Sequence, residues 1–119
     1  MKIYAQNPNV ILAGPNAVKN RTAVNKNVEE SDLFVAVLSA QDVELQSIIG
    51  NKLLWKLQDL VATADINNVQ NESYKILLDN YIIPFLCVIA AIKVIPVVQY
   101  KIRNKGLVTT SDDKVYNVA

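Results

Sequence analysis

Apolar residues recur at helical spacing in three parts of the chain. Residues 52–64 and 71–102 carry the spacing clearly, and the longer of the two is apolar on most of its circumference. Residues 29–49 begin with acidic side chains, as helices often do, and then alternate steps of four and three at Phe34, Leu38, Gln41, Leu45 and Ile48. The pattern predicts a mostly α-helical fold, a small bundle of about three helices around a long central one.

Glycine and proline mark the joints between these helices. Gly50 directly follows the first helix, where a residue with positive φ commonly ends it, so we expect a structural turn there. A competing interpretation makes residues 34–38 a strand and lets Ser39 cap a shorter helix. The periodicity runs unbroken across Ser39 and favours one helix. The third helix keeps its spacing through Pro84, which predicts a kink there and a bend or break at Pro96.

The two ends of the chain lack this period. Residues 1–28 contain two prolines, a glycine and six asparagines, and predict an extended N-terminal arm that precedes a helical domain at residues 29–119. Near the other end, residues 104–106 (Asn-Lys-Gly) predict a turn with positive φ at the glycine. Residues 107–110 then favour a short extended or β-like loop.

The stretch YIIPFLCVIAAIKVIPVV, residues 81–98, has two interpretations. Its 18 residues lie at the lower limit for a membrane span, and basic residues follow it, as they follow a stop-transfer segment. Lys93 within it would cost about 3 kcal/mol at bilayer depth, however, and the two other apolar segments can cover it. We therefore favour the central helix of a soluble bundle, and a small single-span membrane protein is the alternative.

Composition agrees with one domain whose surface is partly covered by neighbours. The chain has 119 residues, of which 51% are hydrophobic and only 19% charged, so we expect part of the surface to lie against other subunits. The single cysteine, Cys87, lies in the apolar stretch and is expected to be a buried, reduced thiol. The N-terminus does not resemble a signal peptide, which predicts synthesis in a reducing cytoplasm.

Charge is segregated along the chain, although the net charge is only +1. Residues 1–28 hold four basic and no acidic residues, and residues 29–44 hold five acidic and no basic ones. Contact between identical subunits, head to tail, would pair these charges; alternatively, the acids only favour a helix N-terminus. If subunits contact head to tail, we expect the arm to be disordered in a monomer and to become ordered on the next subunit. Deletion of residues 1–20 would then leave the helices folded. The interface candidates are Ile11, Leu12, Lys19, Arg21, Lys26, Glu29, Glu30 and Asp32.

The residues that common enzyme chemistry needs are sparse. The sequence has no histidine and one cysteine, which leaves out the commonest general base and an ordinary zinc site. Its three glycines form no phosphate loop and no dinucleotide fingerprint. The adjacent carboxylates at 29–30 and 112–113 are expected to be solvated at a helix start and in a turn. We therefore expect no enzyme activity, cofactor or metal, and a function in assembly or binding.

Two segments of the chain carry a resemblance to a known family. They are AQDVELQSIIGNKLLWKLQDL, residues 40–60, and LLDNYIIPFLCVIAAIKVIPVVQYKIRNKGLV, residues 77–108. In their order and spacing they resemble the head-to-tail connector proteins (adaptor, head-completion or neck-ring proteins) of tailed bacteriophages, especially of crAss-like and related phages of Bacteroidetes hosts. Members usually continue past Asp113 into a further helix. This sequence ends at Ala119, so either the arrangement here is shorter or part of a longer product is absent. In both cases the arm and residues 104–110 become the better candidates for the portal contacts of that helix.

The resemblance implies a structural virion protein, made in the host cytoplasm and located at the head–tail neck. It would form a ring of twelve copies between portal and tail around the DNA channel, with itself, the portal and other neck or tail proteins as partners. Contact with packaged DNA would be non-specific and salt-dependent; alternatively, the basic side chains only extend from a helix C-terminus. If the protein is not a member of this family, the same basic side chains would suit a non-specific DNA-binding accessory protein. The channel or portal candidates are Lys101, Arg103, Asn104, Lys105 and Gly106, and the structural ones are Gly50 and Pro84.

Overall fold

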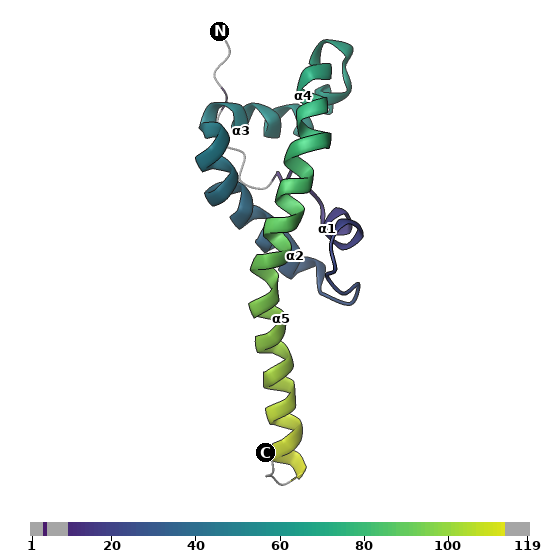
Figure 1. Ribbon diagram of the computed structural model, residues 1–119, viewed down its shortest axis with the longest axis vertical. Helices are drawn as coiled ribbons and strands as arrows, with labels where there is room; N and C mark the ends of the chain where they lie inside the picture. Colours follow the sequence, from purple (N-terminus) through teal and green to yellow (C-terminus); the bar gives the residue numbers. More distant parts are fainter. Residues whose placement is uncertain (1–3, 5–9, 114–119) are drawn as a thin grey trace.

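The computed structural model describes Tyr4 and residues 10–113, with side chains as far as residue 104. The protein is mostly helical, as the periodicity predicted, and no strand occurs among the described residues. Helix α5 forms the long axis of the molecule, and the other helices gather around its first half (Figure 1). The molecule is elongated, with extents of 66 × 24 × 22 Å.

Residues 30–62 form one helical path made of three elements. Helix α2 spans Glu30–Ser39, the π-helical segment η1 spans Ala40–Leu45, and α3 spans Gln46–Ala62. The backbone is helical at Ser39, which confirms one helix across it and excludes the alternative strand at 34–38. At Gly50, φ is +83° and ψ is 164°, so the path kinks there. The positive φ predicted for this glycine is confirmed.

The buried face of this path differs from the predicted one before η1 and after it, but not within it. Leu33, Val37 and Ala40 point into the core, whereas Phe34 and Leu38 are only partly buried and Ile48 is 66% exposed. A π-helical turn contains more residues than an α-helical turn. Within η1, Gln41 and Leu45 are buried as predicted. The wider turn thus joins the face of Leu33 and Val37 to that of Gln41 and Leu45, and a constant period of 3.6 residues does not describe this path.

A second helical path runs through Pro84 without a break. Helix α4 spans Glu72–Leu77, the π-helical segment η4 spans Leu78–Ile82, and α5 spans Ile83–Asp113. In an α-helix the ring of Pro84 would clash with the carbonyl four residues earlier. The wider turn before it, in which the Ile83 N–H donates to the Leu78 carbonyl, relieves that crowding. The predicted continuation through Pro84 is confirmed, and Pro96 also lies within α5.

The N-terminal segment is helical where the sequence predicted an extended arm. Helix α1 spans Pro15–Arg21, with its proline at the first helical position. Proline suits that position, because its φ is already helical and the N–H that it lacks would have no partner. The expected interruption is thus a helix start, and the prediction is wrong for residues 15–21. Residues 1–3 and 5–9 of the arm lie outside the described part.

The predicted turn and loop near the C-terminus are helical as well. Helix α5 continues through Gly106 and through residues 107–110 to Asp113. Extending an existing helix adds one hydrogen bond for each residue fixed, and a glycine costs only about 1 kcal/mol against alanine. Local preferences for a turn and a strand are therefore outweighed by the long helix before them. Residues 114–119 lie outside the described part.

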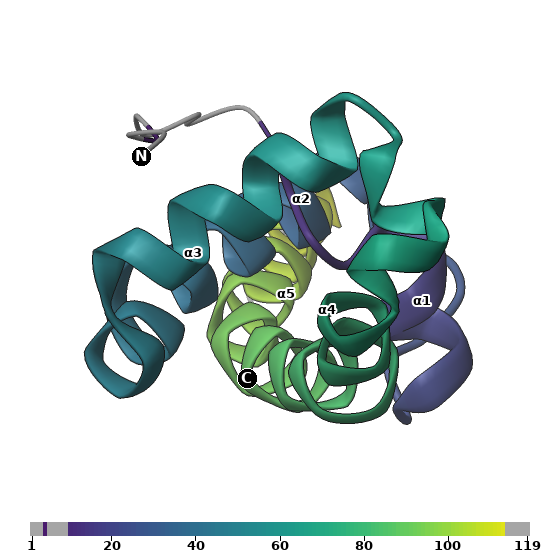
Figure 2. The same ribbon diagram turned by 90° about the horizontal axis from the view of Figure 1, so that it is seen from above.

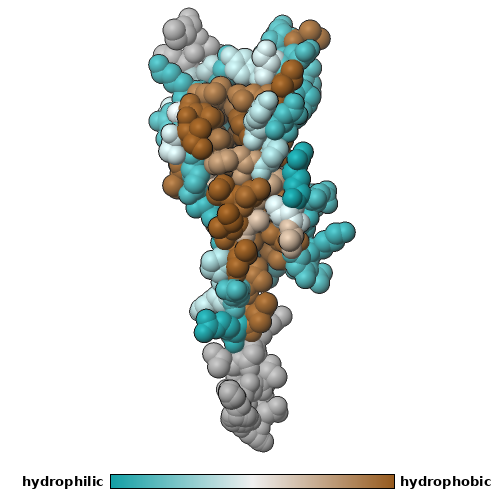
Figure 3. Space-filling view, viewed as in Figure 1, coloured by the Kyte–Doolittle hydropathy of each residue, from teal (hydrophilic) through white to brown (hydrophobic). Residues whose placement is uncertain are grey.

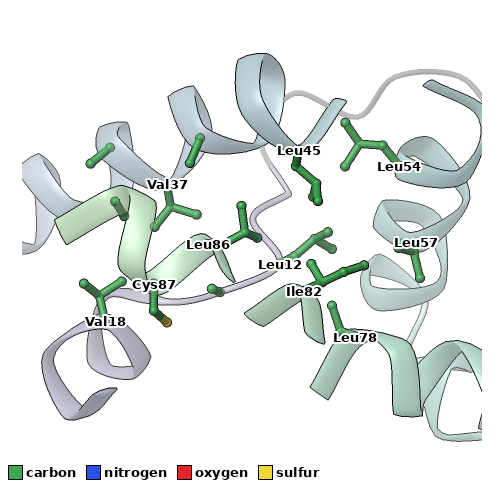
Figure 4. Packing of buried hydrophobic residues seen from close by; sticks show 14 of the residues in the cluster. Leu12, Val18, Val37, Leu45, Leu54, Leu57, Leu78, Ile82, Leu86 and Cys87 are labelled. Carbon is green, nitrogen blue, oxygen red and sulfur yellow. The ribbon is translucent and has the colours of Figure 1, made fainter. Parts of the chain in front are cut away.

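The core lies where α1, α2, η1, α3 and α5 meet. Helix α5 packs mainly on α2 and also on α1 and η1. Figure 2, which looks from above, shows α1 and α3 on different sides of α5. Leu12 from the N-terminal segment lies among the helices, near Ile82 and Leu86 of the second path (Figure 4). The N-terminal segment thus completes the core of its own chain.

Candidate interaction surface

Two buried glutamines hold the N-terminal segment against the helices. The amide oxygen of Gln41 accepts a hydrogen bond from the Leu12 N–H, and its amide nitrogen donates to the Val10 carbonyl over 3.1 Å. Gln58 donates to the same carbonyl over 3.0 Å, while its amide oxygen finds no partner among the described residues. Both glutamines are almost completely buried. The side-chain amides therefore provide hydrogen-bond partners for the backbone groups of this segment, as a neighbouring strand does for an edge strand.

Sequence reasoning missed this role of the glutamines, although a signal existed. Gln41 occupies a position in the apolar spacing of its helix, where a polar side chain needs a partner. The candidates Ile11 and Leu12 were expected to contact another subunit. Leu12 is buried in its own chain, and Ile11 packs beside it, partly exposed.

Lys101 pairs with the acidic start of α2 in the same chain. Its ammonium lies 2.7 Å from the Asp32 carboxylate and 3.5 Å from that of Glu29. The hydrogen bond to Asp32 raises the pKa of Lys101 above its ordinary value, and the charges of Asp32 and Glu29 act in the same direction. Lys101, expected at the channel, is thus brought together with two residues expected at a subunit interface.

Lys93, the charge within the apolar stretch, also has an acidic partner. Its ammonium lies 3.1 Å from the Glu44 carboxylate of η1, and both side chains are about one-third exposed. The pair ties the middle of α5 to the first helical path. The lysine that argued against a membrane span therefore sits beside a carboxylate, where both charges are partly shielded from water.

The other candidate residues lie apart from one another. Lys19 donates a hydrogen bond to the Lys26 carbonyl over 2.8 Å, within the basic segment itself. Arg21 and Lys26 are exposed, and so is Glu30 in the first turn of α2. Arg103 and Asn104 are exposed on α5. Lys105 and Gly106 lie in the helical backbone of α5, but their side chains are outside the described part.

Cys87 is fully buried in the core, beside Val18 (Figure 4). Burial raises the pKa of its thiol, and the positive charge of Arg21 lowers it by less. A raised pKa keeps the thiol protonated near neutral pH, so it is a poor nucleophile. Among the described residues, no group of three or more histidine, cysteine, aspartate or glutamate side chains is placed to hold a metal ion.

An apolar ridge along α5 is left uncovered by the rest of the described chain. Figure 3 shows hydrophobic side chains along the face of α5 that is turned to the viewer. The ridge side chains are between 50% and 67% exposed, and we call them the α5 ridge: Tyr81 at the end of η4, and Val88, Ile92, Ile95 and Ile102 of α5. Val88, Ile95 and Ile102 are seven residues apart, and Ile92 lies between the first two of these. That is the spacing by which one helix packs along another.

Comparison with known proteins places the chain in a family. The family model of DUF6712, a family of unknown function, matches residues 45–119, more than half of the chain. The chain belongs to the DUF6712 family. The matched part begins at the end of η1 and contains α3, α4 and α5, and with them the whole α5 ridge. No curated protein and no solved structure gives a significant match.

Two helical paths of this DUF6712 protein are long and apolar enough to cross a membrane, judged by length and composition alone. They are Glu30–Ala62 and Val69–Asn104. Only about a third of the most apolar window in each is buried. Most of each window therefore lies outside the buried core.

Proposed function

We propose that this DUF6712 protein is a structural virion protein that forms a homomeric ring, of twelve copies, joining the portal to the tail around the DNA channel. The observation that carries the proposal is the uncovered α5 ridge, because a helix face with coiled-coil spacing is suited to a protein neighbour. The order of motifs shared with phage connector proteins supports the same assignment. Its partners are then further copies of itself, the portal and other neck or tail proteins.

The exposed end of α5 is the part that we assign to the portal or the channel. The second half of α5 extends beyond the helices that gather around its first half (Figure 1), and Arg103 and Asn104 are exposed on it. Lys101 is engaged by Asp32 and Glu29, so Arg103 is the better candidate for contact with DNA phosphates. Such contacts act through counterion release and carry no sequence preference. We also propose that α5 bends at Pro84 or Pro96, and that this bend sets the direction in which the exposed end points.

Examination of purified phage particles tests the proposal. The protein is expected in the virion, and cryo-electron microscopy of the neck is expected to locate it as a ring between portal and tail. Absence of the protein from particles that are complete and infectious would contradict it.

The second candidate is a small membrane protein anchored by residues 81–98, and the exposed apolar face of α5 favours it. The Lys93–Glu44 pair argues against it, because insertion of α5 alone would separate the two charges. Fractionation of cells without detergent distinguishes the two candidates. The ring protein is expected in the high-speed supernatant, and the membrane protein in the pellet.

A further inference from the structure

The molecule carries a groove between α2 and α5. It has a volume of about 300 Å³ and is lined by Val35, Ala36, Ser39, Val94 and Val97, together with Asp32 and Lys93. Ala36 and Ser39 are small and allow a helix to approach closely. Asp32 and Lys93 already have partners of opposite charge, Lys101 and Glu44. The groove is therefore open to an apolar occupant without leaving a charge unpaired.

Ridge and groove lie on opposite sides of α5. Val97 in the groove is nine residues from Val88 on the ridge, which at 100° per residue places the two about half a turn apart. A contact between one copy's ridge and the next copy's groove joins two different surfaces. Such a heterologous contact leaves a free ridge at one end and a free groove at the other, and it closes into a ring or continues as a filament.

The α5 ridge is not covered by the described part of its own chain. Its five apolar side chains are at least half exposed. Soluble monomers rarely leave a contiguous apolar face uncovered, so the ridge is suited to a protein neighbour. The ridge also continues its spacing through the exposed Gln99, between Ile95 and Ile102. A polar residue at such a position is accommodated between helices, but it is unfavourable in lipid.

We infer that the α5 ridge of one copy docks into the α2–α5 groove of a second copy of this chain. The inference rests on the proposed function in one respect, since it names the contact that joins the copies of the proposed ring. It differs from the contact that charge alone suggested. The basic segment was expected on the acidic start of the neighbour's α2, but Lys101 of the same chain pairs with that start.

Disulfide trapping in the purified full-length chain tests the inference. One variant carries Ile92→Cys on the ridge together with Ser39→Cys in the groove, a change of nearly equal size. Oxidation is expected to link ridge to groove between copies and to give a ladder of dimers, trimers and larger species. The single variants are expected to give none, and Cys87 is buried and does not interfere. A matched control replaces Ser39→Cys with Val69→Cys, an exposed apolar position on η3, residues Val69–Asn71.

Three outcomes would overturn the inference. One is no ladder from the double variant, and another is an equal ladder from the Val69 control. The third is an Ile92→Cys dimer, which would mean that two ridges meet each other around a two-fold axis. In support, Ile92→Asp is expected to weaken self-association about 30-fold, as loss of a central interface residue does, whereas Val69→Asp leaves it unchanged. The presence of the protein in virions is a separate observation, so either idea can fail while the other stands.

Discussion

The side-chain amide of Gln41 and the backbone N–H of Leu12, 29 positions apart in the sequence, are joined by a buried hydrogen bond. Through this bond the π-helical segment η1 fixes the N-terminal segment, and Leu12 enters the core. Gln58 supports the same segment through one bond to the Val10 carbonyl. Of the two glutamines, only Gln41 accepts a hydrogen bond from a buried backbone N–H, whereas Gln58 donates to a carbonyl that Gln41 also contacts.

This difference predicts unequal effects of two matched substitutions. Gln41→Met would leave the Leu12 N–H without a partner, at a cost of about 1–3 kcal/mol of unfolding free energy. Gln58→Met would remove an amide oxygen that has no partner among the described residues, and Val10 would keep its bond to Gln41. We expect a cost below about 1 kcal/mol there. Urea denaturation followed by circular dichroism measures both, and equal costs would contradict the special role of the Gln41–Leu12 hydrogen bond.

Removal of the N-terminal segment should destabilise the helical domain. The sequence predicted that the chain without residues 1–20 stays folded, but Leu12, Ala13 and Val18 belong to the core. We now expect a large loss of cooperative thermal unfolding in the truncated chain. Val18→Ala should cost about 1–3 kcal/mol, because it deletes buried methyl groups. Asn20→Ala, at an exposed position of α1, is the control. Unchanged stability of the truncated chain would contradict this and would support the first hypothesis, in which the N-terminal arm does not pack on its own helices.

Gly50 should tolerate a side chain less well than Gly14 does. Neither glycine has a heavy atom within 4 Å of an added Cβ, so packing does not distinguish them. Gly50 has φ +83° and ψ 164°, a region almost restricted to glycine, whereas Gly14 has φ −79°. Gly50→Ala should cost about 1–3 kcal/mol through backbone strain. Gly14→Ala should stay within about 0.5 kcal/mol. Equal melting temperatures would mean that the kink at Gly50 can be lost without cost.

Arg103 and Lys101 should differ in any contact with DNA. The Lys101 ammonium is held by Asp32 and Glu29, and Arg103 is exposed with no ion pair among the described residues. Arg103→Ala is therefore expected to lower the salt dependence of DNA binding by about one counterion, and Lys101→Ala by less. Titration of a labelled duplex at several salt concentrations measures the slopes. A larger effect of Lys101→Ala would show that its ion pairs open on binding.

The helical class, the positive φ at Gly50 and the passage through Pro84 could be predicted, because each follows from local spacing or backbone geometry. Helix α1 was missed, because a Gly-Pro pair can interrupt a helix or begin one. The burial of Val18 in the core favours the helix, and the sequence alone does not show that burial. The turn at Gly106 was wrong because helix propagation outweighs a single glycine. The pairs Lys101–Asp32 and Lys93–Glu44 join residues far apart in the chain, so composition revealed the charges but not their partners.

The central claim is the proposed place of this protein in a phage neck. Native mass spectrometry of the chain mixed with the portal protein that this proposal requires tests it most directly. The account predicts one complex in which a portal ring carries a fixed number of copies of this protein, twelve by the proposal. Ile92→Asp should deplete that complex, and Val69→Asp should not. A spectrum that holds only free portal and monomeric chain, at concentrations where each component is soluble, would contradict the proposal that this protein is a ring-forming subunit of the phage neck.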